Sequence, residues 1–183
     1  ANDNETNRPL VLIAHTGSFL PPIINGQATG STRDSSVVVL CQELAARGYV
    51  VGAFGYRLGW NPVGDEDTRR GTLLQAAYRG IQDTRTCARF FRRSVAEDNN
   101  RFGINPDQIA IIGVGTGGYL AMGAATLYDF EEVTLDKFIS TTTNFPYIDQ
   151  TVHGDLFGEQ QAAINIPNHV GYSSDIGFSF NLG

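Results

Sequence analysis

The apolar residues of this chain form short continuous runs, separated by longer stretches in which they recur at helical spacing. The first run, residues 9–14 (Pro-Leu-Val-Leu-Ile-Ala), has the length and composition of a strand that is buried on both faces. Residues 49–56 and 108–112 predict two further strands on the same grounds. Two shorter runs, residues 137–141 and 177–182, complete the set.

Helical patterns lie between the first strands. Asp34 is a suitable cap residue for a helix that continues through Arg47 and ends at Gly48. After a polar loop over residues 57–70, apolar positions recur at helical spacing from about residue 73 to residue 96. Strands that alternate with helices predict an α/β fold, with a mostly parallel sheet and helices on both of its faces.

Composition narrows the class of protein. The 183 residues are 42% apolar and 17% charged, which suits one domain, residues 1–183, with one sizeable core. A net charge of −6 argues against nucleic acid as a partner. No apolar run approaches the roughly 20 residues of a membrane span. The chain begins at Ala1, which is compatible with signal-peptide removal and a secreted or periplasmic protein, or with trimming, so the compartment stays open.

Four arginines and two cysteines are best explained by structural and not by functional roles. Arginines spaced three and four apart predict a solvated helix face paired with acids, and not an anion site; they are Arg85, Arg89, Arg92 and Arg93. Cys41 and Cys87 lie within predicted helices in apolar surroundings, so we expect buried free thiols. No pattern indicates a metal site or a bound cofactor, and the oligomeric state is left open.

The segment with the most chemical content is residues 108–127, which predicts a strand, a tight glycine turn and a helix in immediate succession. The turn, residues 113–117, reads Gly-Val-Gly-Thr-Gly. Such a junction lies at the carboxyl ends of the strands, where α/β proteins bind ligands. The loop after the first strand, residues 15–19, and Arg57 fall at the same edge.

These segments resemble the carboxylesterases and lipases of the α/β-hydrolase superfamily. Residues 15–19 (His-Thr-Gly-Ser-Phe) are similar to the His-Gly-Gly-x-Phe oxyanion loop, and residues 56–59 (Tyr-Arg-Leu-Gly) to the end of Asn-Tyr-Arg-Leu-Gly. The helix and loop before the turn are matched by residues 81–85, 90–91 and 102–109. The resemblance covers nearly the whole chain and implies an α/β-hydrolase fold.

The resemblance assigns roles to the loop after the first strand. Backbone N–H groups of Gly17, Ser18 and Thr116 would stabilise an oxyanion. Thr16 and Ser18 stand where the family has glycines, so their side chains would crowd the approach to those donors.

Other residues near the strand ends receive roles by the same resemblance. His15, Phe19 and Trp60 would lie at the mouth of a pocket for a small-molecule ester or apolar ligand. Arg57 and Asp83 would form a structural ion pair beneath the site.

By the same resemblance the turn corresponds to the family's nucleophile elbow, in which glycines flank the attacking serine. Here Gly113 and Gly117 are the flanking glycines, and Gly115 occupies the serine position, so no attacking group is present. Thr116 is a weaker candidate nucleophile, because a shifted elbow would place Val114 where a small residue is required and would strain a β-branched residue. The sequence thus predicts a carboxylesterase-like protein that is inactive as it stands.

The family's acid and histidine follow the serine on later strands, so the resemblance implies a domain truncated before them at Gly183. Improvised partners within the chain are better explained as solvated or capping groups; they are His153, His169, Asp149, Asp155 and Asp175.

Two alternatives remain. One is an active carboxylic ester hydrolase that uses a displaced nucleophile or residues beyond Gly183. The other is a dinucleotide-binding protein, since Gly113, Gly115 and Gly118 fit G-x-G-x-x-G between a strand and a helix. In that alternative Glu131 or Glu132 would contact the ribose, although both precede the next predicted strand instead of ending it.

Overall fold

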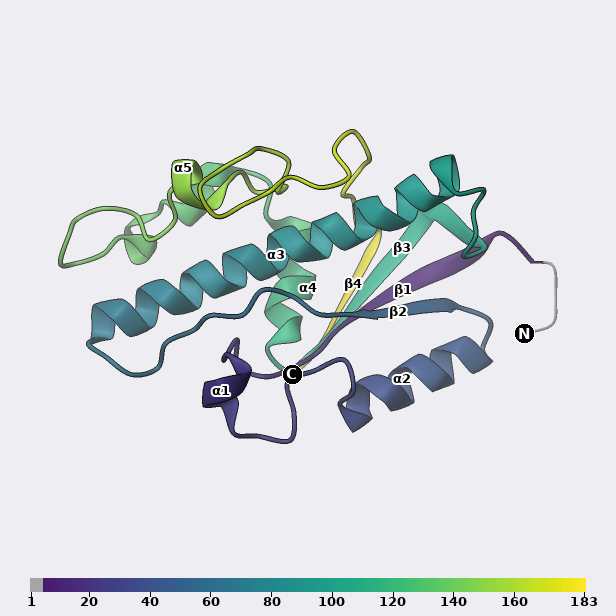
Figure 1. Cartoon of the computed structure of the whole chain (residues 1–183), viewed down its shortest axis with the longest axis horizontal. Helices are drawn as coiled ribbons and strands as arrows, with labels where there is room; N and C mark the ends of the chain where they lie inside the picture. The colour runs from purple at the N-terminus through teal and green to yellow at the C-terminus, as the bar shows by residue number, and fades with distance from the viewer. Residues whose placement is uncertain (1–4) are drawn as a thin grey trace.

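The structure is a computed structural model of the chain, and it describes residues 5–183. Four parallel strands form one sheet in the order β2-β1-β3-β4, with β1 in the interior and β4 at an edge. Helices lie on both faces of this sheet (Figure 1). The chain has an α/β fold, as the alternation of strands and helices predicts. The elements are β1 Arg8–Ala14, α1 Pro22–Asn25, α2 Ser35–Ala46, β2 Val50–Phe54, α3 Glu66–Glu97, β3 Ile104–Val114, α4 Gly117–Thr126, η1 Phe130–Val133, η2 Asp136–Phe138, α5 Gln150–His153 and β4 Phe178–Leu182.

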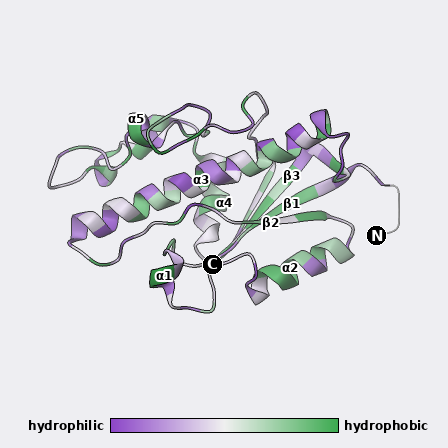
Figure 2. Cartoon of the chain, viewed as in Figure 1, coloured by the Kyte–Doolittle hydropathy of each residue, from purple (hydrophilic) through white to green (hydrophobic). Residues whose placement is uncertain are grey.

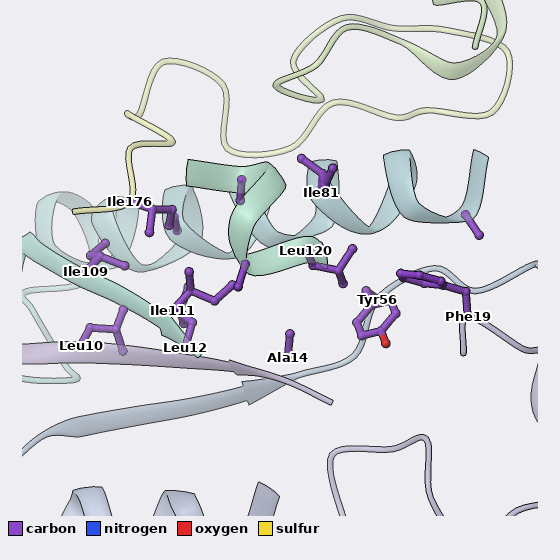
Figure 3. Close-up of a cluster of buried hydrophobic side chains, with 14 of the residues drawn as sticks. Leu10, Leu12, Ala14, Phe19, Tyr56, Ile81, Ile109, Ile111, Leu120 and Ile176 are labelled. Atoms are coloured by element: carbon purple, nitrogen blue, oxygen red, sulfur yellow. The ribbon is translucent and has the colours of Figure 1, made fainter. Parts of the chain in front are cut away.

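Strand β1 is buried on both faces because its side chains alternate between two cores. Leu10, Leu12 and Ala14 face α3 and α4 in the main core, and Figure 3 shows them beneath Ile111 and Leu120. Val11 and Ile13 point to the opposite face and pack with α2. Figure 2 shows the matching pattern, with hydrophobic colour along α2 and alternating polar and apolar turns along α3.

The sequence placed most elements correctly, but it misjudged two boundaries and predicted one strand that does not form. Helix α3 begins at Glu66 instead of residue 73, because Asp65 accepts the Thr68 N–H at 2.7 Å and caps a first turn of polar residues. Strand β3 begins at Ile104 instead of residue 108, and its pairing with β1 shifts register before Ile109. Residues 137–141 do not form the predicted strand: they contribute the end of η2 and one isolated bridge, between Ile139 and Pro146.

The arginines of α3 overturn another expectation, because two of them are buried instead of solvated. Arg85 and Arg89 are 1% and 0% exposed. The Arg85 guanidinium donates to the carbonyl oxygens of Leu156, at 2.9 Å, and Ala124, at 3.2 Å. It also lies over the ring of Phe157, 4.5 Å from the ring centroid.

Arg89 and Arg92 continue the same pattern further along α3. Arg89 donates to the Phe157 carbonyl at 2.6 Å and to the Ser174 hydroxyl at 2.7 Å. Arg92 donates to the carbonyl oxygens of Ser173, at 2.7 Å, and Asp175, at 2.9 Å. Arg93, in contrast, is exposed and pairs with Glu97 as the sequence predicts. One side of α3 therefore holds the irregular segment 154–176 by its backbone.

Both cysteines are free, as expected, but each residue is only partly buried. Burial raises the pKa of the Cys87 thiol to about 12. Within residues 5–183, no helix combines the length and apolar character needed to cross a membrane.

Arg89→Met is expected to lower the free energy of unfolding by roughly 3 kcal/mol, because it leaves buried carbonyl oxygens without their donor. Arg93→Met, on the exposed side of the same helix, is the matched control and should change stability little. Urea denaturation of both variants measures the difference. Equal effects would show that the carbonyl contacts of Arg89 do not hold segment 154–176.

Candidate functional site

The carboxyl ends of β1 and β3 lie side by side and bring together the two loops that the sequence singled out. The two strands are parallel neighbours, with Ala14 paired to Gly113. Residues 15–19 leave β1, and the turn at Gly115 and Thr116 leaves β3 before α4 begins at Gly117. The structure thus places the glycine turn against the loop that follows the first strand.

The backbone of the turn packs directly against the backbone at the end of β1 and the start of that loop. A Cβ on Gly117 would lie 2.4 Å from the Ala14 carbonyl oxygen and 2.7 Å from that of His15, so no larger residue fits there. Gly113 lies in β3, between Ala14 and Asn181 of the neighbouring strands. The Gly115 N–H donates to the Leu182 carbonyl at 3.2 Å, which ties the turn to the end of β4.

Gly115 has a left-handed backbone, with φ of 55°. A Cβ at this position would lie 2.4 Å from Thr16 Oγ1 and 3.0 Å from Thr16 Cβ. The Thr16 side chain therefore fills the space in which a side chain at position 115 would begin. Sequence reasoning treated Thr16 only as a crowding residue. The sequence signal for this role is that Thr16 stands where the resembled family has a glycine.

One backbone donor of the β1 loop, the Ser18 N–H, is engaged within the chain. The Ser18 N–H donates to Thr116 Oγ1 at 3.0 Å. The Gly17 carbonyl accepts the Leu20 N–H at 3.0 Å and closes a turn. The hydroxyl of Thr116 thus lies against one of the donors that the resemblance assigns to an oxyanion hole.

His15 and Tyr56 form a buried stack beside this contact. Their ring centroids are 4.4 Å apart, with 18° between the planes, and the Tyr56 hydroxyl donates to the His15 carbonyl at 2.8 Å. Burial raises the pKa of Tyr56 to about 12, against the lowering effect of the Thr116 hydroxyl. Tyr56 is therefore a neutral hydrogen-bond donor near pH 7 and not a base. His15 Nδ1 lies against the Thr16 carbonyl oxygen.

Phe19 and Trp60, which the resemblance places at the mouth of a pocket, lie close together. The Phe19 side chain is only 2% exposed, however, so it is part of the core. Its ring packs edge-on against Tyr56 in the main core, where Figure 3 shows both side chains. The Phe19 carbonyl accepts the N–H groups of Gly59 and Trp60 at 2.9 and 3.0 Å. These contacts join the β1 loop to the segment after β2.

Arg57 and Asp83 form the ion pair that the resemblance implies. Arg57 Nε lies 2.8 Å from Asp83 Oδ1, and the Arg57 N–H donates to Oδ2 at 2.7 Å. Burial raises the pKa of Asp83, although the adjacent guanidinium acts in the opposite direction. Arg57 also donates to Asn165 Oδ1 at 3.3 Å, so the pair connects β2, α3 and the later segment.

The two later histidines lie along α3. His153 packs edge-on against Tyr78 and accepts the Asp149 N–H at Nδ1. His169 packs against Phe90, and its Nδ1 contacts Arg93. Burial lowers the pKa of both imidazoles.

The acids that the sequence paired with these histidines have local partners. Asp149 caps α5 by accepting the Thr151 N–H, and Asp155 accepts the N–H groups of Glu159 and Gln160. Asp175 uses its carbonyl to accept from Arg92. Glu132, a candidate for ribose binding, caps η1 through the Tyr128 and Asp129 N–H groups. Among the described residues, no three His, Cys, Asp or Glu side chains gather as metal ligands.

Among known proteins, this chain is similar to several solved structures. No family model and no curated protein matches the sequence. A thermophilic esterase from the Planctomycetes species Thermogutta terrifontis is 22% identical over 71% of this chain and 38% of its own, with a TM-score of 0.41. Its butyrate-bound form is 24% identical over 76% and 42%, also with a TM-score of 0.41.

An acetyl ester-xyloside bifunctional hydrolase from Caldicellulosiruptor lactoaceticus is 18% identical over 64% of this chain and 33% of its own, with a TM-score of 0.35. This chain therefore spans about two fifths or less of the length of these enzymes. The fold class rests on the parallel sheet and its two helical layers.

Gly115→Ser is expected to lower the free energy of unfolding by roughly 2 to 3 kcal/mol, because it adds backbone strain and a clash with Thr16. In a Thr16→Gly background the clash is removed, so the cost should fall by about 1 kcal/mol. A double-mutant cycle by urea denaturation measures this coupling.

Gly26→Ser is the control for the strain alone, because Gly26 has nearly the same φ, of 57°, and the nearest atom to an added Cβ is the Ile24 carbonyl oxygen at 3.9 Å. Additive effects of Thr16→Gly and Gly115→Ser would contradict the filling role of Thr16.

Proposed function

We propose that this chain is a carboxylesterase-like α/β-hydrolase domain that does not hydrolyse esters and keeps the fold for binding a small ester or apolar ligand. The observation that carries the proposal is the contact between Thr16 and Gly115. A nucleophilic residue at the turn would need its side chain in the space that Thr16 Oγ1 fills, 2.4 Å from the Cβ position. Nucleophilic catalysis requires an attacking group at that point.

The engaged N–H of Ser18 supports the same conclusion. Oxyanion stabilisation requires N–H groups that are free to bind the developing charge. Here the Ser18 N–H already donates to Thr116 Oγ1. The Thr116 hydroxyl of the turn therefore occupies one of the three donors that the resemblance assigns to the oxyanion. A substrate carbonyl would have to displace the threonine hydroxyl before it could bind.

The arrangement of the motifs supports the resemblance on which the proposal depends. The histidine loop follows β1, the Tyr-Arg-Leu-Gly segment follows β2, and the glycine turn follows β3 at the same sheet edge. The Arg57–Asp83 pair lies where the resemblance expects it. In this proposal residues 1–183 form one partial domain of that superfamily.

A second candidate function is ester hydrolysis with Thr116 as a displaced nucleophile. It is favoured by the position of Thr116 Oγ1 beside the Ser18 N–H. A threonine nucleophile needs an adjacent base, however. Tyr56, which lies close to that hydroxyl, is protonated near pH 7. The ring of His15 stacks on Tyr56 with its Nδ1 against the Thr16 carbonyl oxygen. His153 and His169 contact α3 side chains instead.

The purified protein is expected to hydrolyse 4-nitrophenyl acetate and butyrate no faster than its Thr116→Val variant. Gly115→Ser should also gain no turnover, because a serine there would lack an activated base in this chain. Release of 4-nitrophenolate measures both rates. Activity that Thr116→Val abolishes would establish the second candidate, and activity of Gly115→Ser would show that a working base is present.

A further inference from the structure

A cavity of about 330 Å³ lies between α3 and the segment that follows α4. Leu74, Ala77 and Ile81 of α3 form one wall, and Val133 and Phe138 lie on the other. Its volume is at the lower end of the range for small-molecule sites, roughly 300 to 1,000 Å³. Size and lining therefore suit a small ligand that is mainly apolar.

The cavity is separate from the glycine turn. Ile81 packs against α4 at Gly123, where an added Cβ would lie 2.4 Å from Ile81 Cδ1, and Leu127 at the end of α4 lines the cavity. The turn lies at the opposite end of that helix, at Gly117. A ligand in this cavity would therefore not occupy the turn.

The mouth of the cavity exposes apolar surface to water. Leu135, between η1 and η2, lines the cavity and is 51% exposed. Burial of such surface by a hydrocarbon chain is favourable, by roughly 25 cal/mol per Å². An apolar ligand would cover Leu135 at the point where it enters.

Two charged side chains line the cavity, and only one of them lacks a compensating partner. Glu132 accepts the N–H groups of Tyr128 and Asp129 at 3.2 and 3.3 Å, so its carboxylate is held at the start of η1. Lys137, the single lysine of the sequence, lies over the Phe138 ring, 4.9 Å from the centroid. No carboxylate within residues 5–183 forms an ion pair with it.

We propose that this cavity binds a small aliphatic carboxylate. The hydrocarbon chain lies against Ala77, Ile81 and Val133, and the carboxylate accepts hydrogen bonds from the Lys137 ammonium. A single cation beside apolar walls matches a monoanionic head group on a short chain. This site goes beyond the proposed function, because it uses no residue of the glycine turn or of the β1 loop.

Isothermal titration of the full chain with octanoate, and separately with 1-octanol, tests the proposal. Octanoate should bind more tightly than the alcohol of the same chain length. Lys137→Gln should weaken octanoate binding about fivefold. Arg101→Gln is the matched control, because Arg101 is exposed, lies outside the cavity and gives the same net charge on removal.

A second pair of variants tests the place of binding without altering buried residues. Leu135→Asp puts a negative charge at the mouth and should weaken octanoate binding about tenfold or more. Val63→Asp makes the same change at a loop residue that is 75% exposed and lies outside the cavity, and it should leave binding unchanged.

Three results would overturn the proposal. They are no octanoate binding by the folded chain, equal affinity for octanoate and 1-octanol, and equal effects of a cavity variant and its control.

Discussion

The structure depends above all on hydrogen bonds between the guanidinium groups of α3 and the backbone carbonyls of segment 154–176. That segment contains no strand and no helix, so its carbonyl groups need donors from elsewhere. Arg85, Arg89 and Arg92 supply them, and the last of these holds Ser173 and Asp175 just before β4. The arginines thereby deliver β4 to the edge of the sheet.

The glycine turn depends on the placement of β4 by these arginines. Strand β4 pairs with β3, and the Leu182 carbonyl accepts the Gly115 N–H. On the other side, Thr16 from the β1 loop fills the place of a side chain at Gly115. The turn is thus held between the ends of two strands that come from distant parts of the chain. The same row of arginines also fixes Leu156, a member of the apolar cluster around Tyr78 and Val133, two residues that line the cavity.

The local sequence pattern was sufficient to predict the elements whose formation depends on neighbouring residues. The run at residues 9–14, the helix start at Asp34 and the terminal apolar run each predicted an element that the structure contains. The Asp34 side chain does not cap that helix, however, because it accepts the N–H groups of Gly30 and Ser31 instead. Features decided by distant contacts were not predictable. Arg85 and Arg89 have the spacing of an exposed helix face, and only carbonyl groups 39 to 79 residues later explain their burial.

The candidate site shows the same division. The sequence identified the glycine turn between a strand and a helix, with Gly115 at its centre, because glycine spacing is a local signal. It did not show that Thr16 fills that position or that Thr116 engages Ser18, since both contacts join residues about 100 positions apart. The cavity near Lys137 was also missed, because it is built from α3 and from short helical turns where a strand was expected.

Fluorophosphonate labelling of the folded protein, with any adduct located by mass spectrometry, tests the central claim most directly. A turn that lacks an activated hydroxyl should give no adduct on residues 113–118 or on the β1 loop. An adduct on Thr116 would contradict this account, because it would show that the hydroxyl beside Ser18 is a working nucleophile.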